Sequence, residues 1–146
     1  MRIDIVSPVP RSSTRGNGVT ARRWGQIFEQ LGHQVAISNS FDNSAPLSTD
    51  CLVGIHATRS SAILHRFHDQ APDVPLIVCI SGTDLHRDLA GSDRSSAYQR
   101  AAASLAIADR IVMLEPQGIN QLRDAQLRKR IASKAHVIYQ SAVAVP

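Results

Sequence analysis

The sequence contains few cysteine and aromatic residues and no long apolar run. Two of its 146 residues are cysteine, six are aromatic, and no apolar run approaches the roughly 18 residues of a membrane span. Cys51 and Cys79 lie inside apolar runs, which is typical of buried thiols in a reducing compartment and disfavours a disulfide framework. Asp4 interrupts the apolar segment that a signal peptide would need, so we expect a cytoplasmic protein with no membrane partner.

The charge is basic but scattered. Sixteen basic residues face twelve acidic ones, for a net charge of +4, and fourteen of the sixteen are arginine, whose planar group suits phosphate and carboxylate. The one local cluster, Arg128 to Arg130, is typical of an exposed helix face. With so few aromatic residues, base stacking is disfavoured. We therefore expect small anionic ligands and no nucleic acid.

Apolar periodicity predicts alternating strands and helices in a single domain. Strands are expected at 3–6, 35–37, 51–55, 76–80, 111–114 and 136–139, and helices at 19–31, 63–67, 98–108 and, in one or two pieces, 117–131. In the first helix, Trp24, Ile27, Phe28 and Leu31 share one face, and Gly32 is a stop signal. This alternation predicts an α/β fold, a doubly wound Rossmann-like parallel sheet with helices on both faces.

Ligands of such sheets bind beyond the carboxyl ends of the strands. The segments to search are therefore 8–18, 56–59, 81–88, 115–118 and the residues from 140 onward.

The loop before the first helix has the composition of an anion-binding site. Arg15, Gly16, Asn17 and Gly18 place a positive charge and permissive backbone at a helix start, where free N–H groups and the helix dipole favour an anion. The alternative is a solvated loop. The segment also matches the glycine pattern of dinucleotide sites, but the second strand ends at Ser40 without the acid that binds ribose.

The segment after the fourth strand combines the polar groups of a substrate pocket. Gly82 permits close approach, Thr83 and Asp84 can bond sugar hydroxyls, and Arg87 can pair with phosphate. The alternative is that Thr83 or Asp84 only caps the next helix.

Further candidates lie at other strand ends. His56 and Arg59 suit a proton shuttle or an anion site, or a packed histidine, and Tyr139 can lean on a ligand or cover the core edge. His65 and His68 have a spacing compatible with a metal, but no third ligand is placed to complete it. We expect neither a metal nor a cofactor.

Several segments in chain order resemble a family of enzymes. The glycine loop, the helix that closes at Gly32 and the Gly-Thr-Asp triplet look like the N-terminal half of a GT-B glycosyltransferase of family four. More particular segments resemble the selenosugar synthases of selenoneine biosynthesis, the SenB type. They are Gly16-Asn-Gly-Val-Thr20, His56-Ala-Thr-Arg-Ser-Ser-Ala62, Gly82-Thr-Asp-Leu-His-Arg-Asp-Leu89 and Val137-Ile-Tyr-Gln-Ser141.

The resemblance implies an enzyme that joins selenophosphate to the anomeric carbon of a UDP-sugar and releases UDP. It implies that residues 1–141 form the acceptor-side domain, that 142–146 begin a linker, and that a second domain, absent from this chain, supplies most of the nucleotide-sugar site. Arg59 or Arg87 would then bind selenophosphate, and the loop at Gly82 would meet the sugar. Ser81 departs from the pattern, because family-four relatives have a histidine there. Catalytic residues stay unassigned, and the chain alone is expected to be inactive.

Other functions remain open. One is an ordinary family-four glycosyltransferase domain with a hydroxyl acceptor, which dependence on selenophosphate would separate from the first. Another is a non-catalytic module of the same fold that binds a phosphoryl ligand. A nicotinamide oxidoreductase is disfavoured by the missing ribose-binding acid.

Overall fold

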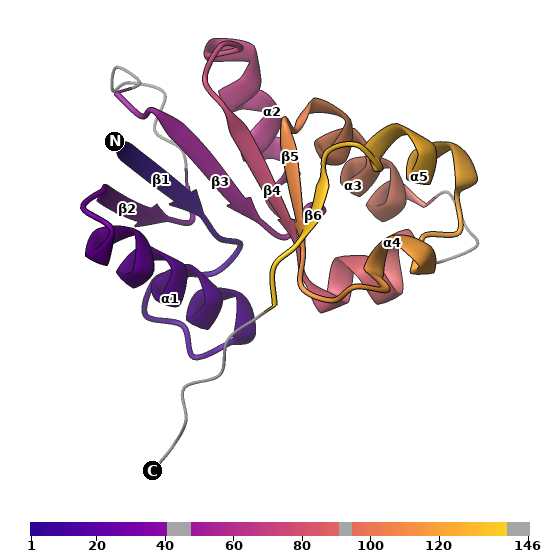
Figure 1. Cartoon of the computed structure of the whole chain (residues 1–146), viewed down its shortest axis with the longest axis horizontal. Helices are drawn as coiled ribbons and strands as arrows, with labels where there is room; N and C mark the ends of the chain where they lie inside the picture. The colour runs from indigo at the N-terminus through magenta and orange to yellow at the C-terminus, as the bar shows by residue number, and fades with distance from the viewer. Residues whose placement is uncertain (41–47, 91–94, 140–146) are drawn as a thin grey trace.

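A six-stranded, all-parallel sheet forms the centre of the computed structural model, which describes residues 1–40, 48–90 and 95–139 (Figure 1). The strands lie in the order β2-β1-β3-β4-β5-β6. Their bounds are β1 Arg2–Val6, β2 Gln34–Ser38, β3 Cys51–Ile55, β4 Leu76–Ile80, β5 Arg110–Met113 and β6 Ala135–Val137. The predicted α/β class with a doubly wound parallel sheet is confirmed.

Helices follow most of the strands. They are α1 Gly16–Gln30, α2 Ser61–Gln70, α3 Ser96–Ile107, α4 Gly118–Gln121 and α5 Ala125–Ile131. The predicted helical stretch 117–131 is therefore two pieces, and the predicted last strand is shorter than 136–139. Residues 41–47, 91–94 and the tail from residue 140, which includes the expected linker 142–146, lie outside the described residues.

The predicted loop 81–88 was too long, because a π-helical turn, η1 Asp84–Leu89, follows Thr83 directly. The N–H of Ala90 donates to the carbonyl of Leu85 five residues earlier, at 2.9 Å. Leu85 and Leu89 are both buried in the core, so apolar packing holds this turn although most of its other residues are polar.

Two cores cover the two faces of the sheet. The larger contains buried side chains of α2, α3, α5 and η1, and the smaller, on the opposite face, contains residues of α1 alone among the described helices. Cys51 and Cys79 are both free and buried, as predicted. Helices thus lie on both faces, but unequally. No described helix combines the length and the apolar character that crossing a membrane requires.

The apolar face of α1 differs in part from the prediction. Trp24 and Phe28 pack on the smaller core, but Ile27 is 41% exposed and Leu31 is 67% exposed. Ile27 borders an open part of the sheet face, where an apolar groove of about 290 Å³ is lined by Trp24, Ile27, Phe28, Val53, Ile77, Val112 and Ile138. Gly32 does end the helix: its φ is +86°, and His33 N–H donates to the Phe28 carbonyl.

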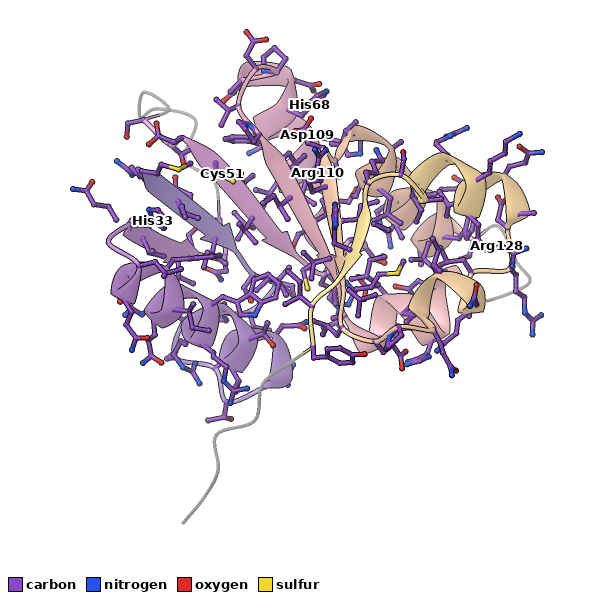
Figure 2. All side chains as sticks on the ribbon, in the orientation of Figure 1. His33, Cys51, His68, Asp109, Arg110 and Arg128 are labelled. Carbon is purple, nitrogen blue, oxygen red and sulfur yellow. The ribbon has the colours of Figure 1, made fainter. Side chains whose placement is uncertain are left out.

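The strand order determines where loops meet. The chain runs outward from β1 to β2 and then returns to place β3 on the other side of β1. The loops after β1 and β3 therefore leave in opposite directions and open a crevice between them, the place where ligands of such sheets bind. The opposite edge holds Cys51, Asp109 and Arg110, labelled in Figure 2 at the starts of β3 and β5.

Candidate functional site

Two adjoining hollows lie along the carboxyl edge of the sheet, each of about 320 Å³. We call the first the cationic lobe; it is lined by Val9, Arg15, Gly16, Asn17, Thr20, Arg59, Ser81, Gly82, Thr83 and Leu114. We call the second the acidic lobe; it is lined by Ile80, Ser81, Gly82, Leu85, His86, Met113, Leu114, Glu115 and Tyr139. Ser81, Gly82 and Leu114 line both, so the lobes adjoin, and we call the two together the groove.

The cationic lobe lies at the crevice between β1 and β3. Arg15 comes from the loop after β1, and Arg59 from the turn after β3, so two segments 44 positions apart supply its positive charges. Both arginines are exposed, and neither side chain pairs with a carboxylate within the described residues. No acidic residue lines this lobe. Two arginines without a carboxylate partner at the border of one cavity suit a phosphoryl group.

The start of α1 adds backbone donors to this lobe. Arg15 is the N-cap in an extended conformation, its side chain makes no capping hydrogen bond, and no acidic residue occupies the first turn. The first N–H groups of a helix have no intrahelical acceptor, and the helix dipole places partial positive charge there. A Cβ atom added to Gly16 would meet nothing within 4 Å, so the backbone here is open to the cavity.

Gly18 has a different function from Gly16. A Cβ atom at Gly18 would lie 2.7 Å from the Ser13 carbonyl oxygen, so this glycine allows the loop to pack on the helix. Arg22 clamps the same loop, because its Nη1 donates to the carbonyls of Arg11 and Ser13, the second at 2.6 Å. The sequence prediction did not assign Arg22, although its place in the second turn of the helix was the available signal.

The floor beneath the cationic lobe is a buried polar network centred on Asp84. Its Oδ2 accepts from the Ala57 N–H at 2.6 Å, and its Oδ1 accepts from the Ser81 hydroxyl at 2.9 Å. Asp84 is fully buried and thus joins the turn after β3 to the loop after β4. In this structure both carboxylate oxygens are engaged by the protein, and sugar binding by Asp84 stays a prediction.

His56 and Asp84 form a buried pair, with His56 Nδ1 3.6 Å from Asp84 Oδ2. Burial lowers the pKa of His56 to about 4, and the charge of Arg59 acts in the same direction. Burial raises the pKa of Asp84 to about 6, against the hydrogen bonds from Ser81 and Ala57. His56 is therefore neutral at pH 7 and contributes no charge to an anion site.

The backbone at His56 is strained and its ring is incompletely satisfied. Its φ is +74°, in the left-handed region that residues with a Cβ rarely adopt, which costs about 1 kcal/mol. Nδ1 accepts from the Arg59 N–H at 3.3 Å, which leaves the proton on Nε2. Nε2 is buried and has no hydrogen-bond partner among the described residues. Strain and an unmet donor together are typical of a functional site.

A second buried carboxylate supports the same turn. Asp88 accepts from the Thr58 hydroxyl at 2.6 Å and from Arg87 Nε at 3.0 Å. Burial acts to raise the pKa of Asp88, but these two bonds and the Arg87 charge hold it below its usual value. The Arg87 side chain is 65% exposed and lines neither lobe, so its predicted contact with phosphate stays untested.

The acidic lobe combines polar groups with an apolar wall. His86 Nε2 lies 3.6 Å from Glu115 Oε1, which also accepts from the Gln121 side-chain amide at 3.0 Å. Tyr139 is 71% exposed and borders the lobe, and Leu85 and Met113 form part of its wall.

The structure brings many of the predicted site residues together. The cationic lobe contains Arg15, Gly16, Asn17, Arg59, Gly82 and Thr83, and Gly82 and Tyr139 line the acidic lobe. His56 and Asp84 lie buried and line neither lobe, and Gly18 packs against the loop. Thr83 is the N-cap of η1 but makes no side-chain capping bond. Val9, Thr20, His86 and Glu115 were not assigned, although segment 115–118 was among those to search.

No group of three or more histidine, cysteine or acidic residues within the described ranges could hold a metal ion. A comparison of the chain with models of protein families found no match. A comparison with curated proteins found none either.

Proposed function

We propose that this chain is the acceptor-side domain of a glycosyltransferase-like enzyme that joins selenophosphate to the anomeric carbon of a UDP-sugar. The observation that carries the proposal is the cationic lobe, where Arg15, Arg59 and the open start of α1 converge without a carboxylate. The four sequence segments that resemble selenosugar synthases support the choice of reaction, and each of them supplies at least one residue to the groove.

The reaction requires a site for the phosphoryl group of selenophosphate and a site for the sugar beside it, and the groove can supply both. A carbon–selenium bond forms at the anomeric carbon while the bond to the UDP oxygen breaks, and UDP leaves with the electron pair. The selenium–phosphorus bond stays intact in this step, so the first product carries both the sugar and the phosphoryl group, and attack by water on phosphorus then releases phosphate and leaves the selenosugar. Arg15 and Arg59 would hold the phosphoryl group of selenophosphate by charge-assisted hydrogen bonds. The N–H groups of Gly16 and Asn17 would add donors to its oxygens. Gly82, between the two lobes, would lie beside the sugar.

A second domain would complete the enzyme. The Rossmann-like sheet supplies one wall of a groove, and in the proposed enzyme a nucleotide-sugar domain closes the other side. Closure of two domains around their substrates excludes water and strengthens each charge interaction in the site. We therefore expect the 146-residue chain to bind the phosphoryl ligand but not to convert the two substrates to product.

The test is mass spectrometry of the products formed from selenophosphate and a UDP-sugar. The complete reading frame and the 146-residue chain are assayed separately, each with an Arg15→Ala/Arg59→Ala variant as a control. A selenosugar from the longer wild-type protein alone, lost in its double variant, is the expected result.

Two other outcomes would redirect the assignment. Transfer to a hydroxyl acceptor without any use of selenophosphate would indicate an ordinary family-four glycosyltransferase. Binding of phosphate with no transfer by either protein would indicate a non-catalytic module. Turnover by the 146-residue chain itself would contradict the need for a second domain.

A further inference from the structure

The acidic lobe has a chemistry of its own. Glu115 and His86 face each other across 3.6 Å, and the Gln121 amide holds Glu115 Oε1 at 3.0 Å. Within the described residues Glu115 Oε2 makes no hydrogen bond, so one carboxylate oxygen remains to accept from a ligand. A carboxylate beside an imidazole can serve neighbouring hydroxyl groups, because the carboxylate accepts and the ring either donates or accepts.

The apolar part of this lobe suits the same kind of ligand. Leu85, Met113 and Leu114 line it, and Tyr139 offers an exposed aromatic ring at its border. A flat ring beside polar groups is a good surface for a molecule with an apolar face and hydroxyls at its rim. The lobe volume of about 320 Å³ is within the lower range for small-molecule sites, roughly 300–1,000 Å³.

Charge separates the two lobes. The cationic lobe has two arginines and no acid in its lining, whereas the acidic lobe has Glu115 and no arginine or lysine. A phosphoryl group is attracted to the first and repelled by the second. A neutral, hydroxyl-rich group meets no such penalty in the second lobe. Because Ser81 and Gly82 line both lobes, one molecule can occupy the whole groove.

We infer that the acidic lobe is a subsite for the hydroxyl-rich, uncharged part of a ligand whose phosphoryl group lies in the cationic lobe. Glu115 and His86 bind its hydroxyls, and Glu115 also rejects a second anionic group. The inference rests on the proposed function for the phosphoryl end only. It adds Glu115 and His86 as specificity-determining residues.

The experiment is calorimetric titration of the whole chain with three probes: inorganic phosphate, glucose 1-phosphate and glucose 1,6-bisphosphate. Wild-type protein is compared with Glu115→Gln, which keeps the shape of the side chain and removes its charge. Glu29→Gln, an exposed change in the last turn of α1, is the matched control. Tyr139→Ala tests the aromatic border independently.

Glucose 1-phosphate is expected to bind wild-type protein about tenfold more tightly than inorganic phosphate, the usual gain from hydrogen bonds to a charged group. Glu115→Gln is expected to remove most of that gain while the affinity for inorganic phosphate changes less than about twofold. The bisphosphate should bind wild-type protein more weakly than the monophosphate, because Glu115 repels its second phosphate. Glu115→Gln should reduce this difference in affinity. Tyr139→Ala should weaken only the sugar phosphates.

The outcomes separate this inference from the proposed function. Equal affinity for glucose 1-phosphate and inorganic phosphate, or an unchanged gain in Glu115→Gln, would overturn the inference and leave the anion site standing. If inorganic phosphate did not bind, but glucose 1-phosphate bound and lost affinity in Glu115→Gln, the phosphoryl assignment alone would be overturned. No binding of any probe would overturn both.

Discussion

The turn after β3 and the loop after β1 lie at the same edge of the sheet, and both are rich in hydroxyls and arginine, yet the structure uses them differently. In the turn, Ala57 and Thr58 donate to buried carboxylates, and Ser60 donates to the Ile55 carbonyl at 2.7 Å. In the loop, Arg15 is exposed and leads into a helix start with no side-chain cap. One segment uses its polar groups internally, and the other presents them to a cavity.

Polar residues near these strand ends are therefore of two kinds. Buried groups with satisfied partners hold the site in shape, whereas exposed groups around a cavity are free to bind. Arg59 connects the two kinds, because its N–H contacts the buried His56 ring while the residue itself lines the cationic lobe.

Asp84→Ala should have the largest effect. It leaves the Ala57 N–H and the Ser81 hydroxyl without their buried acceptor, and each unmet group costs about 1–3 kcal/mol. We expect the free energy of unfolding, measured by urea denaturation, to fall by about 3–4 kcal/mol. Thr83→Ala, next to it but exposed and without a capping bond, is the control and should change less than about 0.5 kcal/mol. Similar losses in both variants would mean that the network does not hold the turn.

The pH dependence of stability should reveal the same carboxyl group. The pKa of Asp84 is raised to about 6 in the folded protein, so the folded state binds its proton more tightly than the unfolded state does. This contribution is fully present below about pH 4 and is lost as the pH rises through 6. Relative to Asp84→Asn, the wild-type protein should therefore gain about 2–3 kcal/mol between pH 7 and pH 4.

His56 opposes this effect in the wild-type protein. Its pKa is lowered to about 4, so its contribution is present at neutral pH and is lost as the pH falls. The two contributions offset each other, and Asp84→Asn should be the more acid-labile protein. Equal pH profiles for the two proteins would contradict the raised pKa of Asp84.

Substitution of the two glycines in the first turn of α1 should have different effects on the free energy of unfolding, because only Gly18 packs against the loop. Gly18→Ala places a Cβ atom 2.7 Å from the backbone oxygen of Ser13, and we expect a loss of about 1–3 kcal/mol. Gly16→Ala meets open space, and we expect less than about 0.5 kcal/mol in the same denaturation experiment. Equal losses at the two positions would show that the loop does not pack on the helix as described.

Removal of a lobe arginine should have the smallest effect on stability but a measurable effect on binding. Arg59→Ala is expected to weaken phosphate binding by about fivefold to tenfold and to leave stability within about 0.5 kcal/mol. Arg66→Ala, which removes the same charge from an exposed position on α2, is the control. An equal loss of affinity in both variants would indicate a general charge effect rather than a site.

Much of the sheet, and the segments that border the groove, could be predicted from local sequence patterns. β3 and β4 coincide with the predicted 51–55 and 76–80, because each is a continuous apolar run bounded by polar residues or proline. The end-of-strand rule also selected the segments that supply Arg15, Arg59 and Gly82 to one lobe.

The remainder depends on contacts between distant segments. Thr83 and Asp84 are adjacent polar residues, and only the partners Ala57 and Ser81 decide that Asp84 is buried. Gly16 and Gly18 differ only in what lies beside them. The placement of Glu115 against His86 depends on the pairing of β4 with β5, which local periodicity does not encode.

The most direct test of the central claim is a titration of the isotope-labelled chain with phosphate at constant ionic strength, followed by the backbone amide signals in NMR spectra. We expect the largest shifts at Gly16, Asn17 and Gly82, and we expect Arg15→Ala/Arg59→Ala to abolish them. Largest shifts instead on α5 around Arg128, which lines neither lobe, would contradict a phosphoryl site in the cationic lobe.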